Sequence, residues 1–193
     1  MSIGIVPQEA SLARGQITPV TFNRGIGWGL IGGSVGTLIM DLILMGVLSA
    51  VGLPALSCFS MVGDTVARFF SILGIEITGG ITAGVATHYI VGPIMGVIFG
   101  AAMVRAGALR AGSKKKIVAI AVLYVEIVSQ PILAMTPFLL KMTAADTLQW
   151  FGSSFVMHLV WGIVLGVIVS HGLQPAKMPH LPAWNAKIRL PPA

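Results

Sequence analysis

Four stretches of this chain are each long and apolar enough to cross a lipid bilayer. They cover approximately residues 26–52, 80–104, 117–140 and 149–171. A helix needs about 20 apolar residues to span a hydrocarbon core of ~30 Å. Only 9% of the 193 residues are charged, whereas a typical soluble domain has about 25%. We therefore expect an all-α membrane protein whose four transmembrane helices form one domain, residues 26–173.

The basic residues are distributed unequally between the two sides of the predicted helices. Ten Lys and Arg residues fall on the side that holds both termini, and two, Arg68 and Lys141, fall on the other side. Short segments rich in Lys and Arg remain in the cytoplasm. We therefore expect both termini to be cytoplasmic, as an arm over residues 1–25 and a tail over residues 174–193.

One basic loop connects the second span to the third. We expect its cations to contact the headgroups of membrane lipids; they are Arg110, Lys114, Lys115 and Lys116. The aromatic and glycine patterns of nucleic-acid-binding modules do not accompany this charge, so nucleic acid is not an expected partner.

The second and fourth spans resemble each other, which indicates an internal repeat. Each has one histidine, His88 or His158, followed by small residues at every fourth position. A carboxylate occupies matching positions in the first and third spans, Asp41 and Glu126. The pattern predicts two helical hairpins that both start in the cytoplasm, a parallel repeat about an axis along the membrane normal.

The first half of the repeat is longer than the second. Asp64 precedes His88 by 24 residues, whereas Asp146 precedes His158 by 12. We expect the additional segment to form a short interfacial helix over about residues 64–73, capped by Asp64.

Small residues spaced by four form flat faces on which helix backbones can approach closely. These faces predict tight packing inside the bundle or against a partner. The residues concerned are Gly29, Gly32, Gly36, Gly92, Gly96, Gly100, Gly162 and Gly166. Proline interrupts two spans, and Pro137 is one example. Such prolines free backbone carbonyls, which then need a donor such as Thr136 or a water molecule.

Four ionisable residues lie within the predicted spans: Asp41, His88, Glu126 and His158. Charge at the centre of a bilayer is costly, so we expect these side chains to face the bundle interior. They could pair to fix helix register, or converge on a divalent metal. The two histidines could instead be axial ligands of haem b, or a histidine and a carboxylate could serve a proton path or a quinone pocket.

Three groups of segments carry a family resemblance. They are Thr87-His88-Tyr-Ile-Val-Gly92, Met135-Thr136-Pro137 with His158-Leu-Val-Trp161-Gly162, and the glycine-rich opening from Gly29 to Asp41. Together they resemble uncharacterised prokaryotic four-span membrane proteins, including the YagU-like inner-membrane proteins. The resemblance covers about residues 26–172. It implies the cytoplasmic membrane of a bacterium or archaeon, and it implies no established activity.

The last twenty residues contain five prolines and should be extended. We expect this tail to contact a partner through Trp184, Lys187 and Arg189. Our leading hypothesis is therefore a non-catalytic accessory subunit that packs against other transmembrane subunits of a larger complex, of an oxidative or energy-transducing kind. The alternative is a redox protein that binds metal, haem or quinone at the intramembrane histidines and carboxylates. A third hypothesis is a small transporter that acts as an oligomer.

Overall fold

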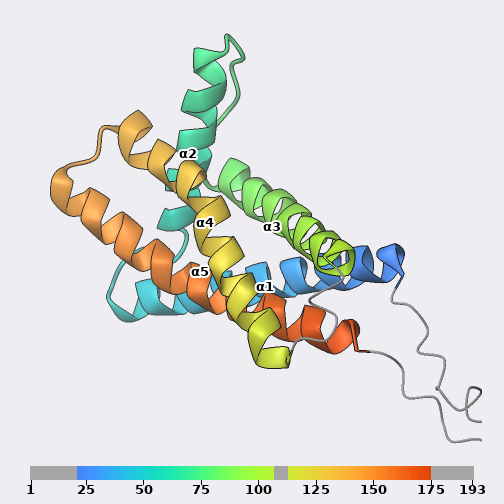
Figure 1. Cartoon of the computed structure of the whole chain (residues 1–193). Helices are drawn as coiled ribbons and strands as arrows, with labels where there is room; N and C mark the ends of the chain where they lie inside the picture. Colours follow the sequence, from blue (N-terminus) through green and yellow to red (C-terminus); the bar gives the residue numbers. More distant parts are fainter. Residues whose placement is uncertain (1–20, 107–112, 175–193) are drawn as a thin grey trace, which may run out of the picture. The chain divides into compact units, whose positions relative to one another are not determined.

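A computed structural model describes residues 21–106 and 113–174 of the chain, and these residues form five helices. The helices are α1 (Phe22–Ala50), α2 (Ser57–Ile72), α3 (Gly80–Arg105), α4 (Lys114–Leu140) and α5 (Ala144–Gly172) (Figure 1). All except α2 are long and apolar enough to cross a membrane. The predicted all-α, four-span fold is confirmed. Four predicted contact residues lie outside the described part of the chain: Arg110, Trp184, Lys187 and Arg189.

Three of the long helices begin at a hydroxyl side chain that caps the free backbone N–H groups of the first turn. The hydroxyl oxygens of Thr21, Ser113 and Thr143 each accept a hydrogen bond from the backbone N–H three residues later. Such caps stabilise helix starts by about 1 kcal/mol. They lie before the apolar stretches, which is why α4 and α5 begin three and five residues earlier than hydropathy predicts.

Glycines bring α1 and α3 into backbone contact. A Cβ atom added to Gly29 would overlap the carbonyl oxygen of Gly96, and one added to Gly33 would overlap that of Gly92. Because neither helix has a side chain at this crossing, the two backbones approach closely. The helices run antiparallel, so the start of α1 lies beside the end of α3 (Figure 1).

The second contact surface of α1 faces α5. A Cβ atom on Gly36 would collide with the Trp161 ring, whose Nε1–H donates a 3.2 Å hydrogen bond to the carbonyl oxygen of Gly33. In turn, α5 packs on α4, where Gly162 meets Val122. All eight predicted packing glycines are buried at such helix contacts within this chain: Gly29, Gly32, Gly36, Gly92, Gly96, Gly100, Gly162 and Gly166.

Helix α2 differs from its prediction in both extent and start. It begins at Ser57, seven residues before the expected start, and Asp64 lies inside the helix rather than at its cap. The Asp64 carboxylate instead accepts a 2.8 Å hydrogen bond from the backbone N–H of Gly80, at the start of α3. Gly63 does not favour extending the predicted helix towards Ser57, because glycine is a poor helix former. It is needed here because a Cβ atom would overlap the carbonyl oxygen of Gly80.

A tryptophan satisfies the carbonyl that Pro137 leaves free. Pro137 has no N–H group, so it cannot donate to the carbonyl of Leu133 one turn earlier. The Nε1–H of Trp150 donates to that oxygen at 3.0 Å, from a buried position on α5. The expected donor, Thr136, instead bonds Thr65 of α2 at 3.1 Å between hydroxyl oxygens. The tryptophan therefore fixes α5 against the interrupted part of α4.

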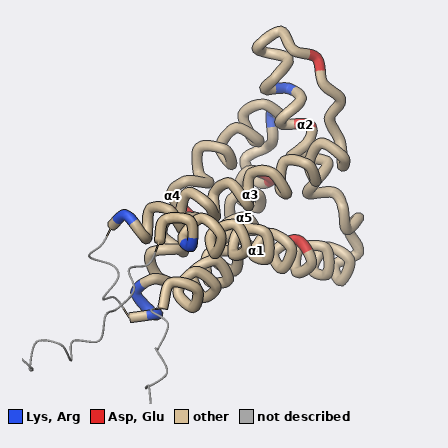
Figure 2. Tube along the Cα trace, turned by 90° about the vertical axis from the view of Figure 1, so that its right-hand side faces the viewer, with Lys and Arg blue, Asp and Glu red and all other residues tan. Residues whose placement is uncertain are grey.

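The basic residues of the described segments concentrate at one end of the bundle. In Figure 2, Lys and Arg gather at the end from which α1 and α4 start. There Arg24 donates a 3.0 Å hydrogen bond to the carbonyl of Gln174, and the Arg105 guanidinium lies 5.5 Å from the Phe22 ring centre. Lys114, at the start of α4, is exposed, as are the two lysines that follow it. The charge asymmetry of the sequence is thus present in space.

We predict opposite effects of alanine at two glycines of the spans. Gly96→Ala should destabilise the protein by about 1–3 kcal/mol, because its Cβ overlaps the α1 backbone. A Cβ atom at Gly27 would meet no atom within 4 Å. Gly27→Ala should therefore stabilise the helix by up to ~1 kcal/mol. Thermal unfolding in detergent would compare them, and equal melting temperatures would contradict this packing.

We also predict that Trp150 and Pro137 are energetically coupled. Trp150→Phe should cost about 1–3 kcal/mol, because the Leu133 carbonyl then has no donor. Pro137→Ala restores a backbone N–H that can reach this carbonyl, so in that background the same substitution should cost less. A double-mutant cycle on unfolding in detergent measures the difference. Additive effects would show that the indole hydrogen bond does not compensate for the proline.

Candidate functional site

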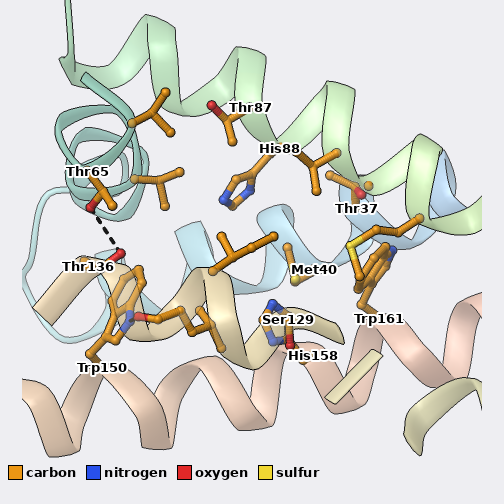
Figure 3. Close-up of a pocket in the computed structure, with 17 residues that line it drawn as sticks. Thr37, Met40, Thr65, Thr87, His88, Ser129, Thr136, Trp150, His158 and Trp161 are labelled. Atoms are coloured by element: carbon orange, nitrogen blue, oxygen red, sulfur yellow. Dashed lines mark hydrogen bonds between the residues drawn. The ribbon is translucent and has the colours of Figure 1, made fainter. Parts of the chain in front are cut away.

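A small cavity of about 120 Å³ lies at the centre of the bundle, between all five helices (Figure 3). Its walls are largely apolar, and the hydroxyl groups in them are engaged. Thr37, Thr65 and Thr87 each donate to the carbonyl one turn earlier on their own helix, at 2.8–2.9 Å. Such local bonds leave these hydroxyls little capacity for a ligand. The imidazoles are the polar groups of the wall that remain available.

A larger cleft of about 610 Å³ adjoins the cavity. The end of α1, the start of α2, the end of α4 and the start of α5 form its walls. Six residues line both spaces: Met40, Val62, His88, Leu133, Trp150 and His158. The two histidines therefore stand where the cavity meets the cleft. Figure 3 shows their rings entering the same space from α3 and α5.

His88 is held by a buried carboxylate of α1. Its Nδ1 lies 2.9 Å from Oδ1 of Asp41, which is only 2% exposed. A carboxylate can only accept, so the shared proton is assigned to Nδ1 of the imidazole. The Phe59 ring packs edge-on against His88, with ring centres 5.1 Å apart. The pairing of histidine with carboxylate that the sequence suggested is thus present in the first hairpin.

The other two predicted residues, both half-buried, hold buried polar atoms that are unpaired. Within the described residues, Nδ1 of His158 and both carboxylate oxygens of Glu126 have no hydrogen-bond partner. Oδ2 of Asp41 is also without one. Glu126 lines neither the cavity nor the cleft. The structure therefore brings His88 and His158 to one site, with Asp41 bonded to His88, whereas Glu126 does not line it.

The metal hypothesis does not fit this geometry. Among residues 21–106 and 113–174, no three His, Cys, Asp or Glu side chains are grouped so that they could hold a metal ion. The expected four-residue ligand set is therefore not formed.

Cys58 is an unreactive part of the cleft wall. It is a free thiol near the start of α2. Burial and, to a smaller extent, the nearby Asp41 carboxylate together raise the pKa of Cys58 to about 11. The thiolate, which is the nucleophilic and metal-binding form, is therefore a minor species at neutral pH.

Sequence reasoning missed the residues that α2 and α5 add to the site. Val62 and Thr65 reach the cavity from α2, a helix whose first turns were not predicted. Trp150 also lines it. The carbonyl that Pro137 leaves without a donor was the signal that could have identified this tryptophan. The reason is that tryptophan is one of the few largely apolar side chains that carry a hydrogen-bond donor.

Comparison with models of protein families, with curated proteins and with solved structures finds no match to this chain. The chemistry of the site therefore has to be inferred from the cavity and its residues.

Proposed function

We propose that this multi-pass membrane protein binds a small amphipathic ligand of the quinone or quinol class between its helices. The observation that carries the proposal is the position of His88 and His158, which face a common, largely apolar space at the junction of the cavity and the cleft. Binding pockets typically combine apolar walls with a few convergent polar groups that orient the ligand. The 610 Å³ cleft is within the usual size range of such pockets.

The hydrogen-bonding groups indicate which ligand atoms would bind. The Nδ1–H of His88 donates a hydrogen bond to Asp41, so the Nε2 atom is an acceptor when the ring is neutral and a donor when the ring is protonated. The ring can therefore bind a hydroxyl in one state and a carbonyl in the other. A ring that carries hydroxyl or carbonyl oxygens, with an apolar tail in the cleft, matches these walls.

The membrane and its orientation belong to the same proposal. The basic end of the bundle supports a cytoplasmic location for both termini, because cytoplasmic loops are rich in Lys and Arg. Lys114, Lys115 and Lys116 are exposed at that end and would contact anionic lipid headgroups. We assign the protein to a bacterial or archaeal cytoplasmic membrane on the resemblance of its sequence alone.

A second candidate function is an accessory subunit of a membrane complex. The small-residue faces are occupied within the chain, so the support comes from the end of α1. None of residues 42–50, all within the described part of the chain, is buried, and Leu42 and Val47 are at least half exposed. A partner helix lying there would cover the mouth of the cleft. Native mass spectrometry of protein extracted from its membrane would show the mass of a complex with another subunit if this is the function, and the mass of this chain alone if it is not.

We predict that a ubiquinone analogue with a decyl tail quenches the fluorescence of Trp150 and Trp161, which line the cavity. His88→Ala and His158→Ala should each weaken its affinity about tenfold, the equivalent of one hydrogen bond. His171→Ala, beside Trp28 at the other end of α5, should leave affinity unchanged. Titration in lipid nanodiscs measures these constants.

Decylbenzene is the matched control ligand because it has the same tail without ring oxygens. It should bind the wild type and both cavity variants alike, which would separate hydrogen bonding from partition into the membrane. If the quinone also bound all four proteins with one affinity, the histidines would have no part in ligand binding and the proposal would be wrong.

A further inference from the structure

The two hairpins use the same register of contacts between their helices. Gly92 meets Thr37 in the first hairpin, and Gly162 meets Val122 in the second. One turn away, Gly96 meets Gly33 and Gly166 meets Val118. The glycines lie four and eight residues after His88 and His158, respectively.

Continuing each register by one turn in the other direction leads to the ionisable residues. In the first hairpin it leads from Thr37 to Asp41, which bonds His88 at 2.9 Å. In the second hairpin it leads from Val122 to Glu126 on α4 and from Gly162 to His158 on α5. Residues four apart lie on the same helix face. Glu126 and His158 thus occupy the positions that Asp41 and His88 occupy in the first hairpin.

The two positions differ in whether the bond is made. Both oxygens of Glu126 and Nδ1 of His158 are buried without a partner in the described residues. A carboxylate lacks a donor, and an imidazole nitrogen of the type that bonds Asp41 lacks an acceptor. Leaving such groups unpaired in the membrane is costly, and a hydrogen bond between the two side chains would satisfy both.

We propose that Glu126 is the carboxylate partner of His158, so that the domain has two equivalent carboxylate–histidine pairs. The Glu126 carboxylate accepts a hydrogen bond from the Nδ1–H of His158. This bond holds the ring so that Nε2 faces the cavity, in the same way that Asp41 holds the ring of His88. Glu126 is then a positioning residue of the ligand site, and it acts through His158. This role in ligand binding rests on the proposed function, whereas the pairing itself does not.

The test of the pairing is the ring-nitrogen spectrum of ¹⁵N-histidine-labelled protein in nanodiscs. We expect Glu126→Gln to shift the Nδ1 resonance of His158 and to leave that of His88 in place. Glu76→Gln makes the same chemical change at an exposed loop carboxylate bonded to Ser71 and should shift neither. A His158 resonance that is identical in wild type and Glu126→Gln would overturn the pairing.

Quinone affinity separates this inference from the function on which part of it rests. We expect Glu126→Gln to weaken decyl-ubiquinone binding in the presence of His158 and to have no further effect in His158→Ala. If His158→Ala binds as the wild type does, the proposed ligand site is wrong, while the spectrum still decides the pairing. If His158→Ala weakens binding and Glu126→Gln does not, Glu126 has no positioning role.

A cross-linking experiment keeps the inference testable if Glu126→Gln does not fold. In a Cys58→Ala background, Glu126→Cys with His158→Cys should form a disulfide on mild oxidation. Ile127→Cys with His158→Cys should not, because Ile127 is 61% exposed on another face of α4. Cross-linking of the control pair alone, or of neither pair, would overturn the facing positions of Glu126 and His158.

Discussion

Where α1 crosses α3, glycine replaces side chains on both helices, and the two backbones lie in direct contact. Water does not drive helices together inside a bilayer, so this close packing has to supply the association energy. Asp41 lies two turns after Gly33 on α1, and His88 lies one turn before Gly92 on α3. The glycine contact therefore sets the distance at which a short aspartate side chain can reach the imidazole.

Beyond that pair the two helices separate. Residues 42–50 of α1 contribute no buried residue to the described structure, and Figure 1 shows the end of α1 running away from the start of α3. The start of α2 packs on α3 there, through Phe59 against Gly84 and Gly63 against Gly80. The cleft lies on the remaining side. Tight packing at one end of the helices and an open space at the other are thus two consequences of one crossing.

The sequence predicted the parts of this structure that depend on local chemistry. Hydropathy located the four spans, and spacing by four located the glycines, because both signals are properties of single helices. The cost of charge in lipid predicted that the ionisable side chains face the bundle interior, but it left open which histidine pairs with which carboxylate. The start of α2 was not predictable in this way, since Gly63 is explained only by its contact with the α3 backbone. Likewise, the absence of Glu126 from the cavity lining depends on packing between helices, which no single stretch of sequence encodes.

The unpaired polar atoms argue against a purely structural role for the ionisable residues. If their purpose were to fix helix register, one closed pair such as Asp41 with His88 would be sufficient. Even with Glu126 bonded to His158 as proposed, Oδ2 of Asp41 and one carboxylate oxygen of Glu126 would still be buried without a partner among the described residues. Apolar residues of similar volume would remove that cost, since buried ionic groups rarely improve stability over hydrophobic ones. Retaining the polar groups is explained if they bind something within the membrane, and the cleft beside His88 and His158 is where it would enter.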